Sequence, residues 1–71
     1  MLVPKVEEIR KRRIEAGLSK WKLSLMAGLP QNALLRIERG ETGYTHPIRA
    51  RAIAEALQCG VEDIFTETKG A

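Results

Sequence analysis

The sequence has a single cysteine, Cys59, and only one tryptophan, one tyrosine and one phenylalanine among its 71 residues. One cysteine excludes an internal disulfide and a metal site built from several thiolates, and it is typical of a reducing compartment. With so few aromatic side chains, the core must consist mostly of Leu, Ile, Val and Ala, which suits packed helices. No apolar run is long enough to cross a membrane and no signal or lipidation motif is present, so we expect a cytoplasmic protein.

The residue patterns that enzymes use are also scarce. The sequence has no paired carboxylates, no cluster of metal-ligand residues and no glycine-rich phosphate loop. Its one histidine, His46, stands beside an expected helix start, where capping or solvent exposure is expected, and Cys59 occupies an apolar position that favours packing over nucleophilic chemistry. We therefore expect no enzymatic activity, no cofactor, no metal and no small-molecule ligand.

The composition supports one small domain. With 44% hydrophobic residues in 71, we expect a single domain over 1–71 with a structured core from about 5 to 66. Twelve Lys and Arg against nine Asp and Glu give a net charge of +3 and a pI near 9.4. This balance fits a polyanionic partner such as nucleic acid but does not require one.

Apolar periodicity predicts helices, and no stretch alternates as a strand would. In the first helix, Val6, Ile9 and Ile14 are expected to share a face toward the core. The expected fold is all-α, with a frayed lead-in over 1–4 and helices over about 5–16, 20–27, 30–39, 46–57 and 61–66.

Glycines and capping residues mark the expected helix ends. Gly17 and Gly28 follow the first two helices, where a left-handed backbone conformation closes a helix. Ser19 is expected to cap the second helix and Thr45 the fourth, and Pro30 suits the first turn of the third. The second and third helices are therefore joined by a tight turn at Gly28.

The third helix has two distinct faces. Leu34 and Ile37 are placed for the core, whereas Gln31, Asn32 and Arg36 carry polar groups suited to base edges. This pattern, in the second of two short helices that meet at a glycine, is typical of a helix-turn-helix that reads DNA.

Several motifs, spaced over about residues 6 to 65, together resemble one family. They are the spine Leu23-Ser24-x-x-Ala27-Gly28-Leu29, the R-I-E-R-G ending at Gly40, G-L-S at 17–19 with Arg13 four residues before its glycine, I-A-E-A-L at 53–57 and V-E-D-I-F at 61–65. In this joint spacing the chain resembles the Xre family, the phage-repressor and Cro/C1-type helix-turn-helix proteins. The resemblance implies a compact five-helix, lambda-repressor-like domain whose third helix enters the major groove. It also implies a sequence-specific, repressor-like transcription regulator that binds double-stranded DNA.

If the third helix enters the major groove as in this family, four residues are candidates for contact with base edges: Gln31, Asn32, Leu35 and Arg36. The amides of Gln31 and Asn32 can pair bidentately with adenine, the guanidinium of Arg36 can pair with guanine, and Leu35 could meet a thymine methyl. Other roles stay open: solvation for the two amides, phosphate contact for Arg36, and a protein-partner surface for Leu35.

The resemblance also implies contacts with DNA phosphates, which position a protein without reading sequence. Trp21 has two readings here, because its indole N–H could donate to a phosphate or its ring could cover the edge of the bundle. Glu41 stands at a position that is frequently basic in the family, so it is expected to weaken one side of the contact. The candidate residues for phosphate contact are Ser19, Lys20, Trp21, Arg39, Tyr44 and Thr45.

The resemblance to the family also implies one structural ion pair and a dimeric assembly. An ion pair between Arg13 in the first helix and Glu38 in the third is expected to orient the recognition helix. One such domain covers half an operator, so we expect a homodimer on a palindromic site, with recognition helices about one DNA turn apart. Ile64 and Phe65, in the C-terminal helix, and the polar tail over 66–71 are the expected dimer contacts.

An alternative function remains open on the same fold. Leu25, Met26 and Leu35 would form an unusually apolar exposed set, unless they pack under Trp21. Such a patch would suit a protein-interaction module, as in an antitoxin-like or co-regulator subunit. Salt dependence separates the two functions, because a protein that contacts phosphates loses affinity for duplex DNA steeply as salt rises.

Overall fold

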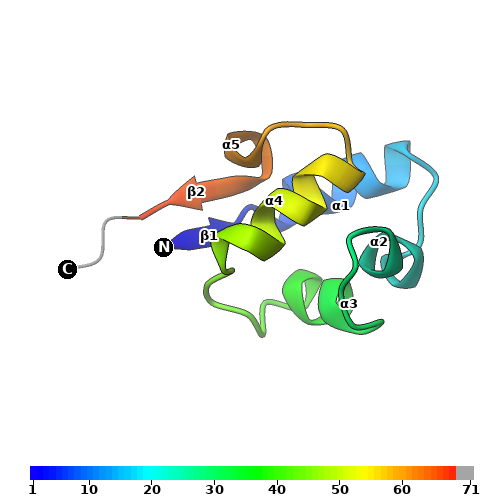
Figure 1. Ribbon diagram of the computed structural model, residues 1–71, viewed down its shortest axis with the longest axis horizontal. Coiled ribbons are helices and arrows are strands. Elements are labelled where there is room, and N and C mark those ends of the chain that lie inside the picture. Colours follow the sequence, from blue (N-terminus) through cyan, green and yellow to red (C-terminus); the bar gives the residue numbers. More distant parts are fainter. Residues whose placement is uncertain (69–71) are drawn as a thin grey trace.

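The computed structural model describes residues 1–68 of the chain. Within them lie two short strands and five helices, which confirms the predicted helical class. The elements are β1 (Leu2–Pro4), α1 (Val6–Glu15), α2 (Lys20–Met26), α3 (Ala33–Glu38), α4 (Pro47–Ala56), α5 (Val61–Ile64) and β2 (Phe65–Glu67). In Figure 1, α2 and α3 lie together at one end of the molecule, and the two strands lie side by side at the other. No helix among these residues is long and apolar enough to cross a membrane.

The core is built from aliphatic side chains of every helix and one phenylalanine. Ile9 of α1 is fully buried, as predicted, but Ile14 is 61% exposed, so the expectation that it faces the core is wrong. Leu18 and Leu29, in the connections between helices, pack against the core from its edge. The buried hydrophobic residues are Leu2, Ile9, Leu23, Leu34, Ile37, Ala50, Ile53, Ala54, Ile64 and Phe65.

The two strands correct the expectation of a frayed lead-in and a strand-free fold. β1 pairs antiparallel with β2, in a register that places Leu2 opposite Glu67 and Pro4 opposite Phe65. Each strand has only three residues, too few for alternation to show in the sequence. Phe65, expected inside the fifth helix, begins β2, so that helix ends at Ile64.

Three helices end as the sequence predicts. Gly17, Gly28 and Gly40 have φ angles of +73°, +71° and +76°, the left-handed conformation that closes a helix at low steric cost. After α4 the same conformation falls on Gln58, with φ +57°, where no glycine signals it.

The helix starts follow the prediction only in part. Ser19 caps α2 as expected, because its Oγ accepts from the backbone N–H of Lys22 at 3.0 Å. The predicted cap of α4 is wrong by one residue: His46 takes this role, and its Nδ1 accepts from the N–H of Ile48 at 3.2 Å. The third helix starts at Ala33, later than the predicted 30, so the residues before it form a turn.

Candidate nucleic-acid interface

The turn between α2 and α3 is held by a buried serine. Ser24 is fully buried, and its hydroxyl donates to the carbonyl of Lys20 at 2.9 Å while accepting from the N–H of Leu34 at 3.1 Å. The first N–H groups of a helix need acceptors, and α3 has no side-chain cap of its own. Ser24 therefore supplies from α2 the acceptor that Pro30 cannot provide. From the sequence, Ser24 was identified only as part of the family spine, without this role.

Glu38 ties α3 to α1. Its side chain is 1% exposed, and its two carboxylate oxygens accept from Arg13 Nε at 2.7 Å and Arg13 Nη2 at 3.1 Å. Arg10 adds a third contact at 3.3 Å, and the remaining Arg13 nitrogen donates to the carbonyl of Leu18 at 2.9 Å. The structure thus brings together the pair that the family resemblance implied, and it adds Arg10, which was not anticipated.

The two amide candidates lie where they can meet a ligand. Gln31 and Asn32 are exposed in the turn that leads into α3, rather than inside its first turn as expected. Leu34 and Ile37 anchor the opposite face of α3 in the core. The two amides therefore project from a backbone that is fixed from behind.

Trp21 has a partner that the sequence did not indicate. Its indole Nε1–H donates to Gln31 Oε1 at 3.1 Å, although the ring remains 54% exposed. This bond turns the Gln31 amide so that its nitrogen is free to donate elsewhere. A phosphate contact by the same indole N–H would require this hydrogen bond to break.

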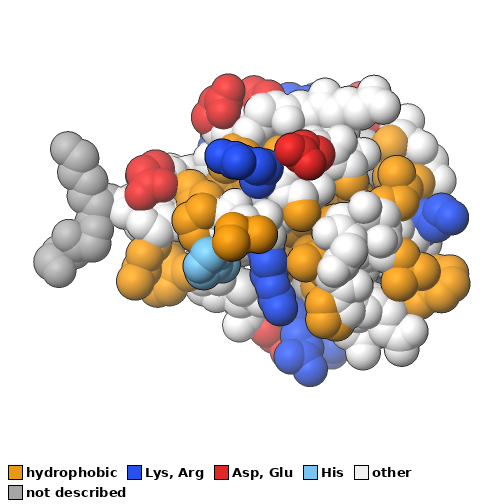
Figure 2. Space-filling model, viewed as in Figure 1, with side chains coloured by type: hydrophobic (Ala, Val, Ile, Leu, Met, Phe, Trp, Pro, Cys, Tyr) orange, Lys and Arg blue, Asp and Glu red, His pale blue; other side chains and the backbone are white. Residues whose placement is uncertain are grey.

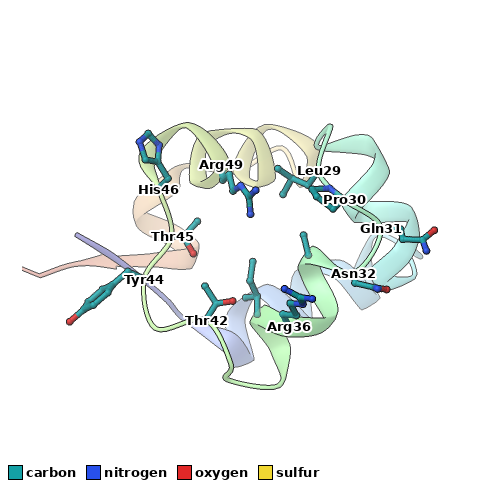
Figure 3. A pocket seen from close by; sticks show the side chains of 12 residues that line it. Leu29, Pro30, Gln31, Asn32, Arg36, Thr42, Tyr44, Thr45, His46 and Arg49 are labelled. Atoms are coloured by element: carbon teal, nitrogen blue, oxygen red, sulfur yellow. The ribbon is translucent and has the colours of Figure 1, made fainter.

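A groove runs between α3 and the start of α4. Its volume is about 430 Å³, and Figure 3 shows Arg36 on the α3 side and Arg49 on the α4 side. Gln31 and Asn32 lie at one end of the groove, where their side chains point outward. Arg49 lines this groove but was not among the residues that the sequence pointed to, because its closeness to α3 depends on how the two helices pack.

The candidates for phosphate contact differ in their access to solvent. Ser19 and Lys20 stand at the start of α2, Tyr44 is 60% exposed, and Arg39 is exposed but forms an ion pair with Glu41 at 3.4 Å. Thr45 is 5% exposed, with its backbone N–H donating to the carbonyl of Leu2 at 2.7 Å. The side chain of Thr45 is therefore the least accessible of the set.

The apolar residues of α2 remain uncovered. Leu25 and Met26 are 47% and 51% exposed, so they do not pack under Trp21. Leu35 is half-buried, so it is less exposed than Leu25 and Met26.

Cys59 packs at the edge of the core. It is half-buried against the buried cluster, and burial raises the pKa of its thiol. Arg12 opposes this rise, and Asp63 and Glu62 add to it. A raised pKa lowers the thiolate fraction at neutral pH, which disfavours nucleophilic chemistry at this position.

Comparison with known proteins identifies the fold. A family model described as helix-turn-helix matches residues 9–64. The solved structure of the restriction-modification controller protein C.AhdI from Aeromonas hydrophila is 24% identical, with a TM-score of 0.75 over 82% of this chain and 86% of that one. The P22 c2 repressor, solved in complex with a synthetic operator, is 32% identical, with a TM-score of 0.73 over 80% of this chain and 85% of that one. A search of curated proteins finds no match. The chain belongs to the helix-turn-helix family of the Xre and Cro/C1 type.

Proposed function

We propose that this chain is a sequence-specific transcription regulator, repressor-like, that places α3 in the major groove of double-stranded DNA. The observation that carries the proposal is the position of Gln31 and Asn32, exposed at the start of an α3 whose other face is buried. Family membership supports it, as does the likeness to a repressor solved on its operator. An α-helix fits the major groove, where each base pair presents its own pattern of donors and acceptors.

Gln31 and Asn32 are the main base-reading residues in this proposal. Because Gln31 Oε1 already accepts from Trp21, its amide nitrogen is the group best placed to donate to an acceptor on a base. Oε1 keeps a second lone pair, so bidentate pairing with adenine stays compatible with the Trp21 bond. Leu35, four residues after Gln31 and half-buried, is a further candidate for contact with a base.

The start of α2 provides the phosphate contacts on one side. Lys20 supplies charge there, and the backbone N–H groups of the first turn supply donors. Arg39 and Tyr44 flank the other side of α3, where Glu41 offsets part of the positive charge of Arg39.

The test is selection of bound duplexes from a random pool at near-physiological salt, followed by affinity measurements on the selected sequence. Gln31→Ala should change the preferred base at one or two positions and cost about 1–3 kcal/mol on the original site. Lys20→Ala should weaken all sequences alike and lower the salt slope by about 1. Equal effects of both variants on preference would contradict this division of roles.

Exposed Leu25 and Met26 favour a second candidate, a protein-interaction module on the same fold. The two functions differ in their response to salt. A regulator binds duplex DNA tightly at low salt and loses affinity steeply as salt rises, whereas an interaction module shows no duplex binding at low salt. Leu25→Lys with Met26→Lys should leave a DNA regulator's selected sequence unchanged.

A further inference from the structure

The two-stranded sheet has one covered edge and one open edge. On the β1 side, Leu2 forms a bridge with Thr45, and the Leu2 carbonyl accepts from the Thr45 N–H at 2.7 Å. On the β2 side, the part of the chain that the structure describes supplies no further strand (Figure 1). β2 is therefore the free edge of the sheet, and such an edge presents unpaired backbone groups to another strand.

The hydrogen bonds to β1 show which backbone groups of this segment point outward. Met1 and Thr68 exchange both of their backbone bonds, at 2.9 Å and 2.8 Å. In an antiparallel pair, such bonded positions alternate with positions that face away from the partner strand. Thr66, two positions before Thr68, therefore faces β1, whereas Phe65 and Glu67 face the open edge.

Three backbone groups at this edge have no hydrogen-bond partner among residues 1–68. The Phe65 N–H donates to the carbonyl of Val61 in α5, but the Phe65 carbonyl and both backbone groups of Glu67 remain unpaired there. Thr66 and Glu67 are exposed, so these groups lie at the surface. Figure 2 shows white surface, which is backbone and uncharged polar side chains, and a red acidic side chain over the end that holds β2 in Figure 1.

β2 lacks the features that normally protect an edge strand. Lysine, proline and β-bulges commonly prevent edge-to-edge pairing, and the strand Phe65-Thr66-Glu67 contains none of them. Its one charge is the Glu67 carboxylate, which accepts from the Met1 amino group at 2.9 Å within the same sheet. The Phe65 side chain is 2% exposed, so it anchors the strand in the core while its carbonyl is directed outward.

We propose that β2 pairs antiparallel with β2 of a second copy of this chain, with Thr66 opposite Thr66 of the partner subunit. In this register each Glu67 N–H donates to the Phe65 carbonyl of the other copy, and the two threonines form a close, non-hydrogen-bonded pair. A register centred on Glu67 would place two carboxylates opposite each other, which is unfavourable. The pairing uses the same strand of both copies, so it creates the two-fold axis that a palindromic operator requires.

This contact is small, because it consists of two hydrogen bonds and one threonine pair. Strands of three residues bury far less surface than a stable dimer interface does. Two protomers bound to neighbouring half-sites, however, have a high effective concentration for each other. We therefore expect a monomer in solution and pairing on the operator. The inference rests on the proposed DNA-binding function and names the surface through which its two copies meet.

Disulfide capture on the selected palindromic duplex tests the register. Thr66→Cys should give a disulfide-linked dimer, since the Cα atoms of a non-hydrogen-bonded pair lie about 4.5 Å apart. Thr68→Cys is the matched control, because this register separates the two copies of that position by about 13 Å, too far for a disulfide. Both variants also carry Cys59→Ala, which removes the native thiol. Any pattern other than selective linkage of Thr66→Cys overturns the proposal.

Cooperative duplex binding tests the backbone contact with the native cysteine in place. Glu67→Pro removes the outward N–H, and an edge strand tolerates proline where its N–H faces solvent. Binding of the second protomer to the palindrome should weaken about tenfold, whereas affinity for a duplex with one half-site should not change. Glu67→Ala is the matched control, because it removes the same carboxylate but keeps the N–H. Equal cooperativity in the two variants overturns the pairing.

The outcomes separate this inference from the proposed function. If the wild-type protein binds its duplex but neither experiment gives the expected result, pairing through β2 is overturned and the proposed function stands. A wild-type protein that binds no duplex overturns the proposed function instead. Linkage of Thr66→Cys but not Thr68→Cys at high protein concentration without DNA then decides on the β2 edge by itself.

Discussion

The indole of Trp21 and the amide of Gln31 make one contact that affects which base the protein prefers. Trp21→Phe keeps an aromatic ring but removes the donor to Gln31 Oε1, so the amide becomes free to rotate. Stability should change by less than about 0.5 kcal/mol, because the ring is exposed. The preferred base should change only at the position that Gln31 contacts, as measured by duplex selection.

A Gln31→Ala background is the control for this prediction, since Trp21→Phe should have no further effect on preference there. A uniform loss of affinity with a lower salt slope would instead show that the indole N–H contacts a phosphate.

Glu38 is the residue whose loss should cost the most stability. Glu38→Gln removes the charge that Arg13 and Arg10 share, and it leaves the nearly buried Arg13 without its partner. We expect a loss of about 3–5 kcal/mol in the free energy of unfolding, measured by urea titration. Glu41→Gln is the control, because its pair with Arg39 is exposed and worth about 0–1 kcal/mol. Similar losses in the two variants would contradict a buried structural role for Glu38.

Some contacts of these residues were predictable from the sequence, and others were not. The ion pair between Arg13 and Glu38 was predictable from the resemblance to the family, because the spacing of these two residues is part of the family's pattern. The contacts of Arg10 with Glu38, and of Trp21 with Gln31, depend on side-chain rotamers across two helices, which no local pattern encodes. Arg49 was missed because its position beside α3 depends on how α3 and α4 pack against each other, which no local pattern encodes.

Among the elements, the link between α2 and α3 depends on one hydroxyl. Ser24→Ala removes the acceptor of the Leu34 N–H and leaves that buried group unpaired. We expect a loss of about 1–3 kcal/mol in unfolding free energy, together with weaker binding to the selected duplex, because the start of α3 is no longer fixed. Thermal unfolding and duplex titration measure the two effects.

Ser19→Ala is the matched control for Ser24→Ala. It removes a cap that serves α2 alone, so it should cost about 1 kcal/mol without changing base preference. If Ser24→Ala leaves both stability and duplex affinity unchanged, the hydroxyl does not hold the turn.

Helix positions were predictable where a residue type acts locally. Gly17, Gly28 and Gly40 end their helices through their own backbone freedom, and Ser19 caps the next turn through its own side chain. The late start of α3 was not predictable, because Ser24 provides its acceptor from another helix. The strands were missed because their partner lies at the other end of the chain, beyond the reach of any window of sequence.

At the scale of the whole molecule, one domain presents one α3, and we propose that two copies occupy a palindromic operator. Ile64 and Phe65 are 0% and 2% exposed, so the expectation that the side chains of these two residues form the dimer contact is wrong. The end of the tail, which was expected to contribute to the same contact, lies outside the described residues. Sedimentation of the protein with its selected duplex should give two protomers per palindrome, with half-sites about 34 Å apart. One protomer per duplex at saturating protein, with a non-repeated selected sequence, would contradict the dimer.

The pairing of β1 with β2 joins segments from opposite ends of the described chain. The Met1 amino group contacts the Glu67 carboxylate, 66 positions away, and closing a loop of that length costs about 4 kcal/mol in chain entropy. We therefore expect the helices to bring the two ends together before β1 and β2 pair. Leu2 also accepts from the Thr45 N–H, so the same strand fastens one wall of the groove. We therefore expect release of the first residues to loosen the connection between α3 and α4 as well.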